Sequence, residues 1–355
     1  MSETVQMQGP VCPVPLRHSE RIVIGHGSGG KMTHDLVKNV FQPYFTNPAL
    51  DVGDDFADLA VQGQRWAITT DSHIVKPILF PGGDIGRLAV CGTVNDLAVS
   101  GARPLYLTAG FILEEGLEVV VLQQVLESMR QAALEAGVSI VAGDTKVVEK
   151  GKADGLFINT AGFGLIPANR RISGNLAAPG DVVLLSGSLG DHAAAVLTAR
   201  GEMGFEAQVE SDVAPLNGLI ETLLESAPST HVLRDPTRGG LATTLNEIAR
   251  QSRVNILLEE ERLPVKPVVR SICDMLGFDP IYMANEGKVI AILPEVEAEA
   301  GLAALRAHPY GKEAVMVGRV ESPRPGDQPR VLMHTAIGGT RLVDMLAGEI
   351  LPRIC

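Results

Sequence analysis

Apolar and polar residues recur along the chain with two different periods, which predicts a mixture of helices and strands. The clearest helical pattern covers residues 118–136, where apolar residues repeat at intervals of three, four and seven and form one stripe. A second helix is expected at 84–99. Short apolar runs in the same half of the chain predict strands at 21–24, 66–70, 105–113, 138–142 and 156–165.

The segment 167–180 is rich in Asn, Arg, Ala and Gly and predicts a domain boundary. Strand and helix patterns then resume, with strands expected at 181–185, 255–259 and 288–293 and helices at 191–199, 240–251 and 267–276. The fold class is therefore α/β (α+β) with two domains. The expected division is a flexible extension at 1–19, domains at 20–167 and 168–340, and a mobile tail at 341–355 that opens with an amphipathic segment, 341–347.

Composition and charge narrow the function. The 355 residues are 45% hydrophobic and 20% charged, which is ample for buried cores. Acidic residues outnumber basic ones 42 to 30, and the net charge of −12 disfavours nucleic acid or an anionic membrane as the main partner. No apolar run reaches the roughly 18 residues that a bilayer span needs, and the first residues lack the apolar core of a signal peptide. We expect a cytoplasmic protein with no membrane partner.

The four cysteines, Cys12, Cys91, Cys273 and Cys355, are far apart and form no CxxC pair, which argues against a zinc site or a disulfide scaffold. Cys91 and Cys273 lie in apolar helical patterns and are expected to be buried. Cys355 is the last residue, so its thiol suits an arm that carries cargo, although chance also places cysteines at chain ends. Because the neighbouring α-carboxylate raises the thiol pKa, we expect a cationic pocket that docks the tip and favours the thiolate.

A glycine-rich segment at 25–33, GHGSGGKMT, nearly matches the phosphate-binding pattern GxxxxGK[ST]. Met32 stands where the magnesium-binding hydroxyl belongs, so an ordinary P-loop is disfavoured. A flap over nucleotide phosphates fits better, with candidate binding residues Gly27, Gly29, Gly30 and Lys31 and a weaker candidate in His26. A plain flexible turn remains the alternative.

Aspartates gather at predicted strand ends and turns: Asp54, Asp55, Asp71, Asp96, Asp144 and Asp235. Each alone has the ordinary explanation of a solvated turn or a helix cap. Several adjoin strongly apolar strands, where an unpaired carboxylate is costly unless a cation binds it. Ligands that offer oxygen only suit Mg²⁺, which commonly accompanies nucleotide phosphates, but spacing alone does not bring these residues into one site.

The chain resembles the HypE family of carbamoyl dehydratases, which serve nickel-iron hydrogenase maturation and belong to the superfamily of aminoimidazole ribonucleotide synthetase and selenophosphate synthetase. The resemblance covers residues 20–355. It is carried by the segments HGSGGK, TTDSHIVKPILFPGGDIGRLAVCGTVNDLAVSGARPLYL, GDTKVVE, LRDPTRGGLATTLNEIA, NEGK and the terminal PRIC. It implies that superfamily's two-domain fold, with the first domain binding ATP and pairing into a homodimer.

The resemblance also implies a reaction. A carbamoyl group on Cys355 would be dehydrated to a thiocyanate, with ATP and Mg²⁺ as cofactors. Our candidate base is Glu286 of NEGK, and Lys146 of GDTK would hold the carbamoyl oxygen or the transferred phosphoryl group. The residues implied to bind metal are Asp55, Asp71, Asp96 and Asp235, and Asp55, Asp71, Asp96 and Asp144 are expected beside the nucleotide. The choice between Asp54 and Asp55 stays open.

The implied partners are the carbamoyltransferase HypF and the HypC–HypD iron scaffold complex, which would accept cyanide. Two other readings compete with this one. Another ATP-using enzyme of the superfamily, of the selenophosphate or thiamine-phosphate type, would act on a diffusible molecule and tolerate loss of Cys355. A non-catalytic scaffold would bind nucleotide and leave the mass of the tail unchanged.

Overall fold

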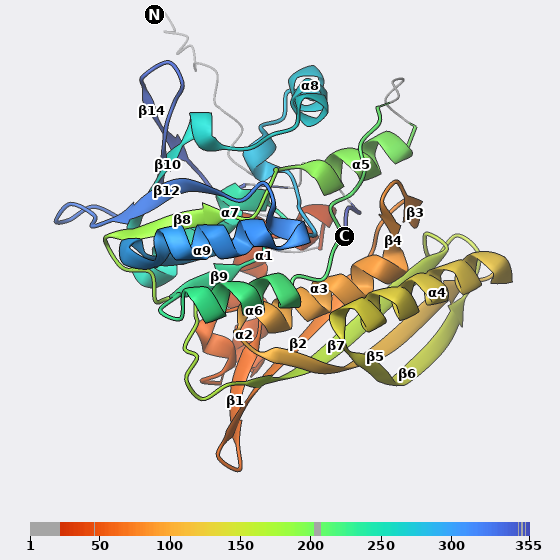
Figure 1. Ribbon diagram of the computed structural model, residues 1–355. Coiled ribbons are helices and arrows are strands. Elements are labelled where there is room, and N and C mark those ends of the chain that lie inside the picture. The colour runs from red at the N-terminus through yellow and green to blue at the C-terminus, as the bar shows by residue number, and fades with distance from the viewer. Residues whose placement is uncertain (1–21, 46, 202–206, 347, 349–350, 352) are drawn as a thin grey trace, which may run out of the picture.

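The computed structural model describes residues 22–45, 47–201, 207–346, 348, 351 and 353–355. Two large β-sheets, each with helices packed on it, form two halves, and the chain ends between them (Figure 1). The extension predicted at 1–19, including Cys12, lies outside the described residues. No helix within the described ranges is long and apolar enough to cross a membrane.

The first sheet has the strand order β1-β2-β7-β5-β6, in which β5 and β6 run parallel and the other neighbours antiparallel. Its strands are β1 (Ala57–Val61), β2 (Gln64–His73), β5 (Arg103–Glu114), β6 (Ser139–Val148) and β7 (Leu156–Ile166). Helices α3 (Ile85–Val99) and α4 (Val119–Ala136) cover one face (Figure 1). On the opposite face Tyr106 is 49% and Ile112 42% exposed.

Local chemistry explains where α3 begins and ends. The Asp84 carboxylate accepts N–H bonds from Gly86 at 2.7 Å and Arg87 at 3.0 Å, which caps the first turn. Past the last turn, Gly101 adopts a φ of +77°, a conformation that glycine takes without strain. Most of the helix is buried, because it packs on the first sheet and also contacts the second half through Asn95, which donates to the Ala214 carbonyl at 3.1 Å.

The second sheet has seven strands in the order β14-β13-β10-β12-β8-β11-β9. They are β8 (Asp181–Leu185), β9 (Val232–Arg234), β10 (Asn255–Glu259), β11 (Ile290–Pro294), β12 (Val315–Glu321), β13 (Val331–His334) and β14 (Thr340–Val343). The helices of this half are α5 (Asp191–Ala199), α6 (Asn217–Ser226), α7 (Gly240–Ser252), α8 (Pro267–Leu276) and α9 (Glu295–Ala307). Its buried core is built largely from Val, Leu and Ile of the strands, α6 and α7.

Shorter elements complete the fold. They are 3-10 helices η1 (Ile24–Gly27), η3 (Leu50–Val52), η4 (Glu260–Arg262), η5 (Pro280–Tyr282) and η6 (Pro309–Gly311), the π-helical turn η2 (Val37–Phe41), helices α1 (Lys31–Leu36) and α2 (Gln42–Phe45), and the hairpin of β3 (Leu79–Phe80) and β4 (Gly83–Asp84).

Most of the predicted helices and strands are confirmed to within three residues at their ends, but β6 continues six residues beyond the strand predicted at 138–142, and one predicted strand is absent from the described residues. The strand predicted at 21–24 is wrong: Arg21 is outside the described residues, and Ile24 begins the 3-10 helix η1. A closed turn replaces the strand, because the Val23 N–H donates to His26 Nδ1 at 3.0 Å and the His26 N–H donates to the Val23 carbonyl at 3.0 Å. Glycines on both sides of His26 permit this tight turn.

The described end of the chain belongs to the fold. Strand β14 extends the second sheet to Val343, into the range predicted as tail. Further on, Ile354 is 5% exposed and joins a core cluster that contains residues of both halves, among them Val75 and Met283. The tip of the tail is therefore packed where the two halves meet.

Candidate active site

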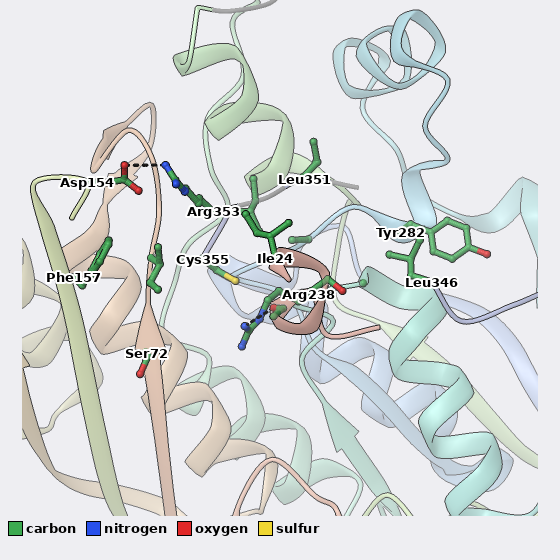
Figure 2. A pocket seen from close by; sticks show the side chains of 16 residues that line it. Ile24, Ser72, Asp154, Phe157, Arg238, Tyr282, Leu346, Leu351, Arg353 and Cys355 are labelled. Atoms are coloured by element: carbon green, nitrogen blue, oxygen red, sulfur yellow. Dashed lines mark hydrogen bonds and ion pairs between the residues drawn. The ribbon is translucent and has the colours of Figure 1, made fainter. Parts of the chain in front are cut away.

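The chain ends in a cavity of about 370 Å³ between the two halves (Figure 2). Its wall includes the glycine-rich segment at Gly27 and Ser28, the end of β2 at Ser72, Arg238 at the start of α7, and the last residues of the tail. The Cys355 sulfur points into this space beside Arg238 (Figure 2).

Backbone pairing holds the tip in this position. Ile354 and Val75 form an antiparallel bridge. The Ile74 N–H donates to a terminal carboxylate oxygen of Cys355 at 3.0 Å, and the Lys76 N–H donates to the Arg353 carbonyl at 3.2 Å. These bonds use only the main chain of the tail, so they fix the direction of the Cys355 side chain whatever group its sulfur carries.

The docked thiol is not activated, which corrects our expectation of a pocket that favours thiolate. Burial raises the pKa of Cys355 well above its ordinary value, and the carboxylates of Glu286 and Asp71 raise it further. Arg238 lowers the pKa but does not offset the other effects. The expected cation is present, but the surrounding carboxylates and the loss of water outweigh it.

Glu286 lies beside the thiol in the NEGK turn and is 4% exposed. Burial raises its pKa well above the ordinary value, and Asp235, Asp212 and Asp71 add to the effect. Its Oε1 atom has no hydrogen-bond partner in the described part of the chain. Glu286 is thus a carboxylate with high proton affinity and one free oxygen, which suits a general base.

Four predicted aspartates are electrostatic neighbours. Burial raises the pKa of Asp55 to about 8 and that of Asp235 to about 6, and it raises the pKa of Asp96 well above its ordinary value. Mutual repulsion contributes, since Asp235 and Asp55 both raise the pKa of Asp96, and Asp71 raises those of Asp96 and Asp235. Arg234 lowers the pKa values of Asp55 and Asp235 but does not offset these effects, so negative charge is in excess in the cluster.

A divalent cation fits this cluster chemically. The Asp55 Oδ2 atom is buried without a hydrogen bond, and its nearest cation is Arg234, 2.5 Å away. Among the described residues, however, no three His, Cys, Asp or Glu side chains are already arranged to hold a metal ion. The set of Asp55, Asp71, Asp96 and Asp235 therefore stays a prediction, in which the side chains would have to close around the ion.

Asp54 and Asp55 differ in what their carboxylates contact. Asp54 is already used structurally: Ser173 Oγ donates to its Oδ2 at 2.6 Å, and the Gly174 N–H donates to its Oδ1 at 2.9 Å. Both donors lie in the connection between the two halves. Asp54 therefore anchors that connection, whereas Asp55 faces the other carboxylates.

The glycine-rich segment packs between Arg238 and the tail. A Cβ on Gly29 would lie 2.9 Å from Arg238 Cβ, and one on Gly30 would lie 2.6 Å from the Leu346 carbonyl oxygen. The Lys31 N–H donates to that carbonyl at 2.8 Å, and Thr33 Oγ1 accepts the Gly29 N–H at 2.9 Å. Within this segment, Gly27 borders the cavity, while Gly29, Gly30 and the exposed Lys31 do not.

Two predicted residues lie away from the cavity. Asp144 and Lys146 form an exposed ion pair on β6, with an N–O distance of 2.6 Å. Strand β6 is three strands from β2 in the sheet order, which corresponds to roughly 14 Å at the usual strand spacing. Within a single chain, Lys146 therefore does not lie near Cys355.

Sequence reasoning missed Arg238, which lies beside Cys355 and Asp71 and donates to the Gly27 carbonyl. It lies in the quoted segment LRDPTRGG, and the available signal was a lone arginine in a glycine turn directly before α7. The burial expected for Cys91 and Cys273 is confirmed, since both are fully buried.

Comparison with known proteins agrees with this architecture. Residues 53–166 match the AIR synthase related protein, N-terminal domain, and residues 178–326 match the AIR synthase related protein, C-terminal domain. The chain is thus an AIR synthase related protein, which confirms the predicted fold class.

More similar relatives narrow the assignment. Carbamoyl dehydratase HypE of Azotobacter vinelandii is 52% identical over 331 residues, which cover 93% of this chain and 96% of that protein. A crystal structure of the maturation protein HypE in complex with ATP is 51% identical, with a TM-score of 0.79 over 94% of this chain and all of that one. A HypE–HypF complex contains a chain 48% identical, with a TM-score of 0.82 over 88% of this chain and 99% of that one. This chain belongs to the HypE family of carbamoyl dehydratases.

Proposed function

We propose that this chain is an ATP-dependent carbamoyl dehydratase that carries its substrate on Cys355 and converts the S-carbamoyl group to a thiocyanate. In this proposal the product supplies the cyanide ligands of the active-site iron of nickel-iron hydrogenase. The observation that carries it is the docked tip: a terminal thiol held inside a cavity, beside Glu286 and Arg238. An enzyme that acts on a diffusible substrate would have no use for its own C-terminus at this place.

The residues around the tip suit this reaction. Bound ATP would supply a phosphate leaving group for the amide oxygen, and Mg²⁺ would neutralise the phosphate charge. Glu286 would accept an N–H proton from the carbamoyl nitrogen through its free Oε1. Arg238 would face the carbamoyl oxygen or the phosphate, since it lies beside the thiol and donates to the Gly27 carbonyl at 3.1 Å. Asp55, Asp71, Asp96 and Asp235 would hold the metal ion.

Because the pKa of the docked thiol is raised, carbamoylation and dehydration would take place at two different positions of the tail. Attack on a carbamoyl donor requires thiolate, which the cavity disfavours, so the tail would be loaded while it is outside. A loaded sulfur bears no charge and can enter the buried position without this penalty. The tail would thus alternate between the two positions, as a tethered substrate must.

The partners follow from this cycle. We propose a HypF-type carbamoyltransferase as the donor, supported by the solved HypE–HypF complex of a relative. We propose a HypC–HypD iron scaffold as the cyanide acceptor and the cytoplasm as the compartment.

A homodimer is part of the proposal. In Figure 1 no helix among the described residues lies on the face of the first sheet opposite α3 and α4. That face offers Tyr106 and Ile112, both more than 40% exposed, and Asp144 and Lys146 stand at its edge on β6. A second copy covering this face would bury apolar surface. Only such a dimer would give Lys146 a role at the reacting group.

The test uses the mass of the tail. The chain is carbamoylated by a HypF-type enzyme, purified free of transferase and nucleotide, and divided between ATP with Mg²⁺ and a non-hydrolysable ATP analogue. Cleavage before Asp344 releases the C-terminal peptide for mass spectrometry. We expect the peptide to lose one water with ATP and to keep its mass with the analogue. A carbamoyl adduct that survives ATP unchanged would contradict the proposal.

A further inference from the structure

The last three residues of the chain accept hydrogen bonds at their main-chain oxygens, and side chains contact two of these oxygens. The Arg353 carbonyl and a terminal carboxylate oxygen of Cys355 accept N–H bonds from the segment 74–76, as described above, and the Arg353 carbonyl also accepts from Arg200 Nη2 at 2.8 Å. The carbonyl of Ile354, between them, points the other way and lies 2.7 Å from His192 Nε2. Since a carbonyl can only accept, Nε2 must carry the hydrogen.

The surroundings of His192 fix that tautomer. Its Nδ1 lies 2.8 Å from Ser211 Oγ, and Ser211 Oγ accepts the Val213 N–H at 3.1 Å. The Ser211 hydroxyl is therefore free to donate to Nδ1, which leaves the proton of the neutral ring on Nε2. The ring is fully buried and packs at 87° to the Phe80 ring, and burial lowers the pKa of His192, which keeps it neutral.

The residue after Ser211 orients the turn that carries the base. Asp212 Oδ1 accepts the Glu286 N–H at 3.1 Å, and its Oδ2 accepts the Gly287 N–H at 3.3 Å and pairs with Lys288 Nζ at 3.0 Å. A Cβ on Gly287 would lie 1.7 Å from the Asp212 carbonyl oxygen, so only glycine allows this approach. Of these two adjacent residues, Ser211 therefore contacts the histidine that binds the tail tip, and Asp212 binds the Glu286 turn.

We propose that His192 is a positioning residue for the tethered substrate. Its Nε2–H donates to the Ile354 carbonyl, and we call this hydrogen bond the grip. Ser211 fixes the tautomer that the grip requires. Asp212 holds the Glu286 turn in a constant position relative to the docked tail. Because the contact is to the main chain, it serves the free thiol, the carbamoyl form and the product alike. The consequence for dehydration rests on the proposed function; the grip itself does not.

Alkylation of Cys355 by N-ethylmaleimide measures the grip without any carbamoyl chemistry. The docked thiol has a raised pKa, so alkylation proceeds through the undocked tail, and its rate reports the undocked fraction. The rate is taken from the peptide 344–355, so the other cysteines do not contribute. Losing one buried hydrogen bond predicts a rate on the order of tenfold higher for His192→Leu. His192→Gln, which keeps a side-chain N–H donor, should stay within about threefold of the unmodified chain.

Ser211→Ala tests the tautomer and replaces His192→Leu if that variant fails to fold. Without the hydroxyl, Nδ1 loses its donor, and we expect alkylation to rise by roughly threefold to tenfold. The matched control is Thr198→Val in the same helix, since among the described residues the Thr198 hydroxyl bonds only to the Ala194 and Ala195 carbonyls. The control should alkylate at the normal rate. Unchanged alkylation in folded His192→Leu or Ser211→Ala overturns the proposal.

Single-turnover dehydration of the carbamoylated chain distinguishes a failure of the grip from a failure of the proposed function. We expect a loss of about tenfold in His192→Leu and restoration in His192→Gln, at unchanged nucleotide affinity. If His192→Leu loses dehydration while its alkylation stays normal, the grip is wrong and the proposed function stands. If the unmodified chain never loses water although His192→Leu alkylates faster, the grip stands and the proposed function is wrong.

Discussion

Arg238 places a guanidinium nitrogen 3.8 Å from a carboxylate oxygen of Asp71. The same side chain lowers the pKa values of Cys355 and Glu286, against the larger effect of burial, and donates to the carbonyl of Gly27. One arginine therefore connects the acidic cluster, the thiol, Glu286 and the glycine-rich segment.

Replacing Arg238 by Met should slow dehydration of the loaded chain by tenfold or more, on the order of one charge-assisted hydrogen bond. Carbamoylation should be unaffected, because in the proposed cycle the tail is loaded outside the cavity. Arg238→Lys keeps the charge but loses the planar guanidinium, so its dehydration rate should fall between those of the unmodified chain and Arg238→Met. Single-turnover mass spectrometry measures all three. A normal rate in Arg238→Met would show that this cation has no part in the reaction.

Replacing Glu286 by Gln keeps the shape of the side chain and removes the proposed base. We expect normal carbamoylation and dehydration slower by a factor of about 10² to 10⁴. Dehydration by the unmodified chain should rise with pH, because Glu286 has a raised pKa and must be ionised to accept a proton. Glu127→Gln, at an exposed ion pair with Arg130 on α4, is the control and should behave normally. Fast turnover by Glu286→Gln would remove the assignment.

The acidic cluster should make the chain without nucleotide or metal less stable as pH rises. Burial raises the pKa of Asp55 from 3.8 to about 8, so the folded chain retains a proton that the unfolded chain releases. Between about pH 4 and pH 8, the free energy of unfolding therefore falls with increasing pH. Urea denaturation should show a flatter pH dependence in Asp55→Asn. An identical slope in both proteins would place Asp55 outside the cluster.

Two glycines of the same loop should respond differently to alanine. A Cβ on Gly30 would lie 2.6 Å from the Leu346 carbonyl oxygen, whereas one on Gly27 would meet no atom within 4 Å. Gly30→Ala should lower the free energy of unfolding by about 1–3 kcal/mol, as overpacking does. Gly27→Ala should stay within about 0.5 kcal/mol. Equal stability of the two variants in urea would contradict the packing of this loop on the tail.

Local patterns predicted most of the regular elements, because each carries its own signals. Helix α3 has a capping Asp84 and a glycine beyond its end, and α4 has a single apolar stripe. The strand expected at 21–24 failed because it was inferred from a short apolar run, whereas the bond between Val23 and His26 favours a turn. Other elements, such as α9, were not predicted.

Sequence motifs predicted several residues of the site but not the contacts between them. The choice between Asp54 and Asp55 depends on Ser173, more than a hundred positions away in the chain. The pKa of Cys355 depends on carboxylates that tertiary structure gathers from β2 and the NEGK turn. The position of Lys146 follows from the strand order, which separates β6 from β2. Sequence spacing contains none of these relations.

The central claim is that the group dehydrated by this chain is carried on Cys355. The most direct measurement compares the full chain with one that ends at Ile354, each incubated with a HypF-type carbamoyltransferase, carbamoyl phosphate, ATP and Mg²⁺. We predict a thiocyanate on the full chain, seen as a carbamoyl adduct less one water, and no adduct or nitrile anywhere on the shortened chain. A nitrile formed on the shortened chain would contradict the account.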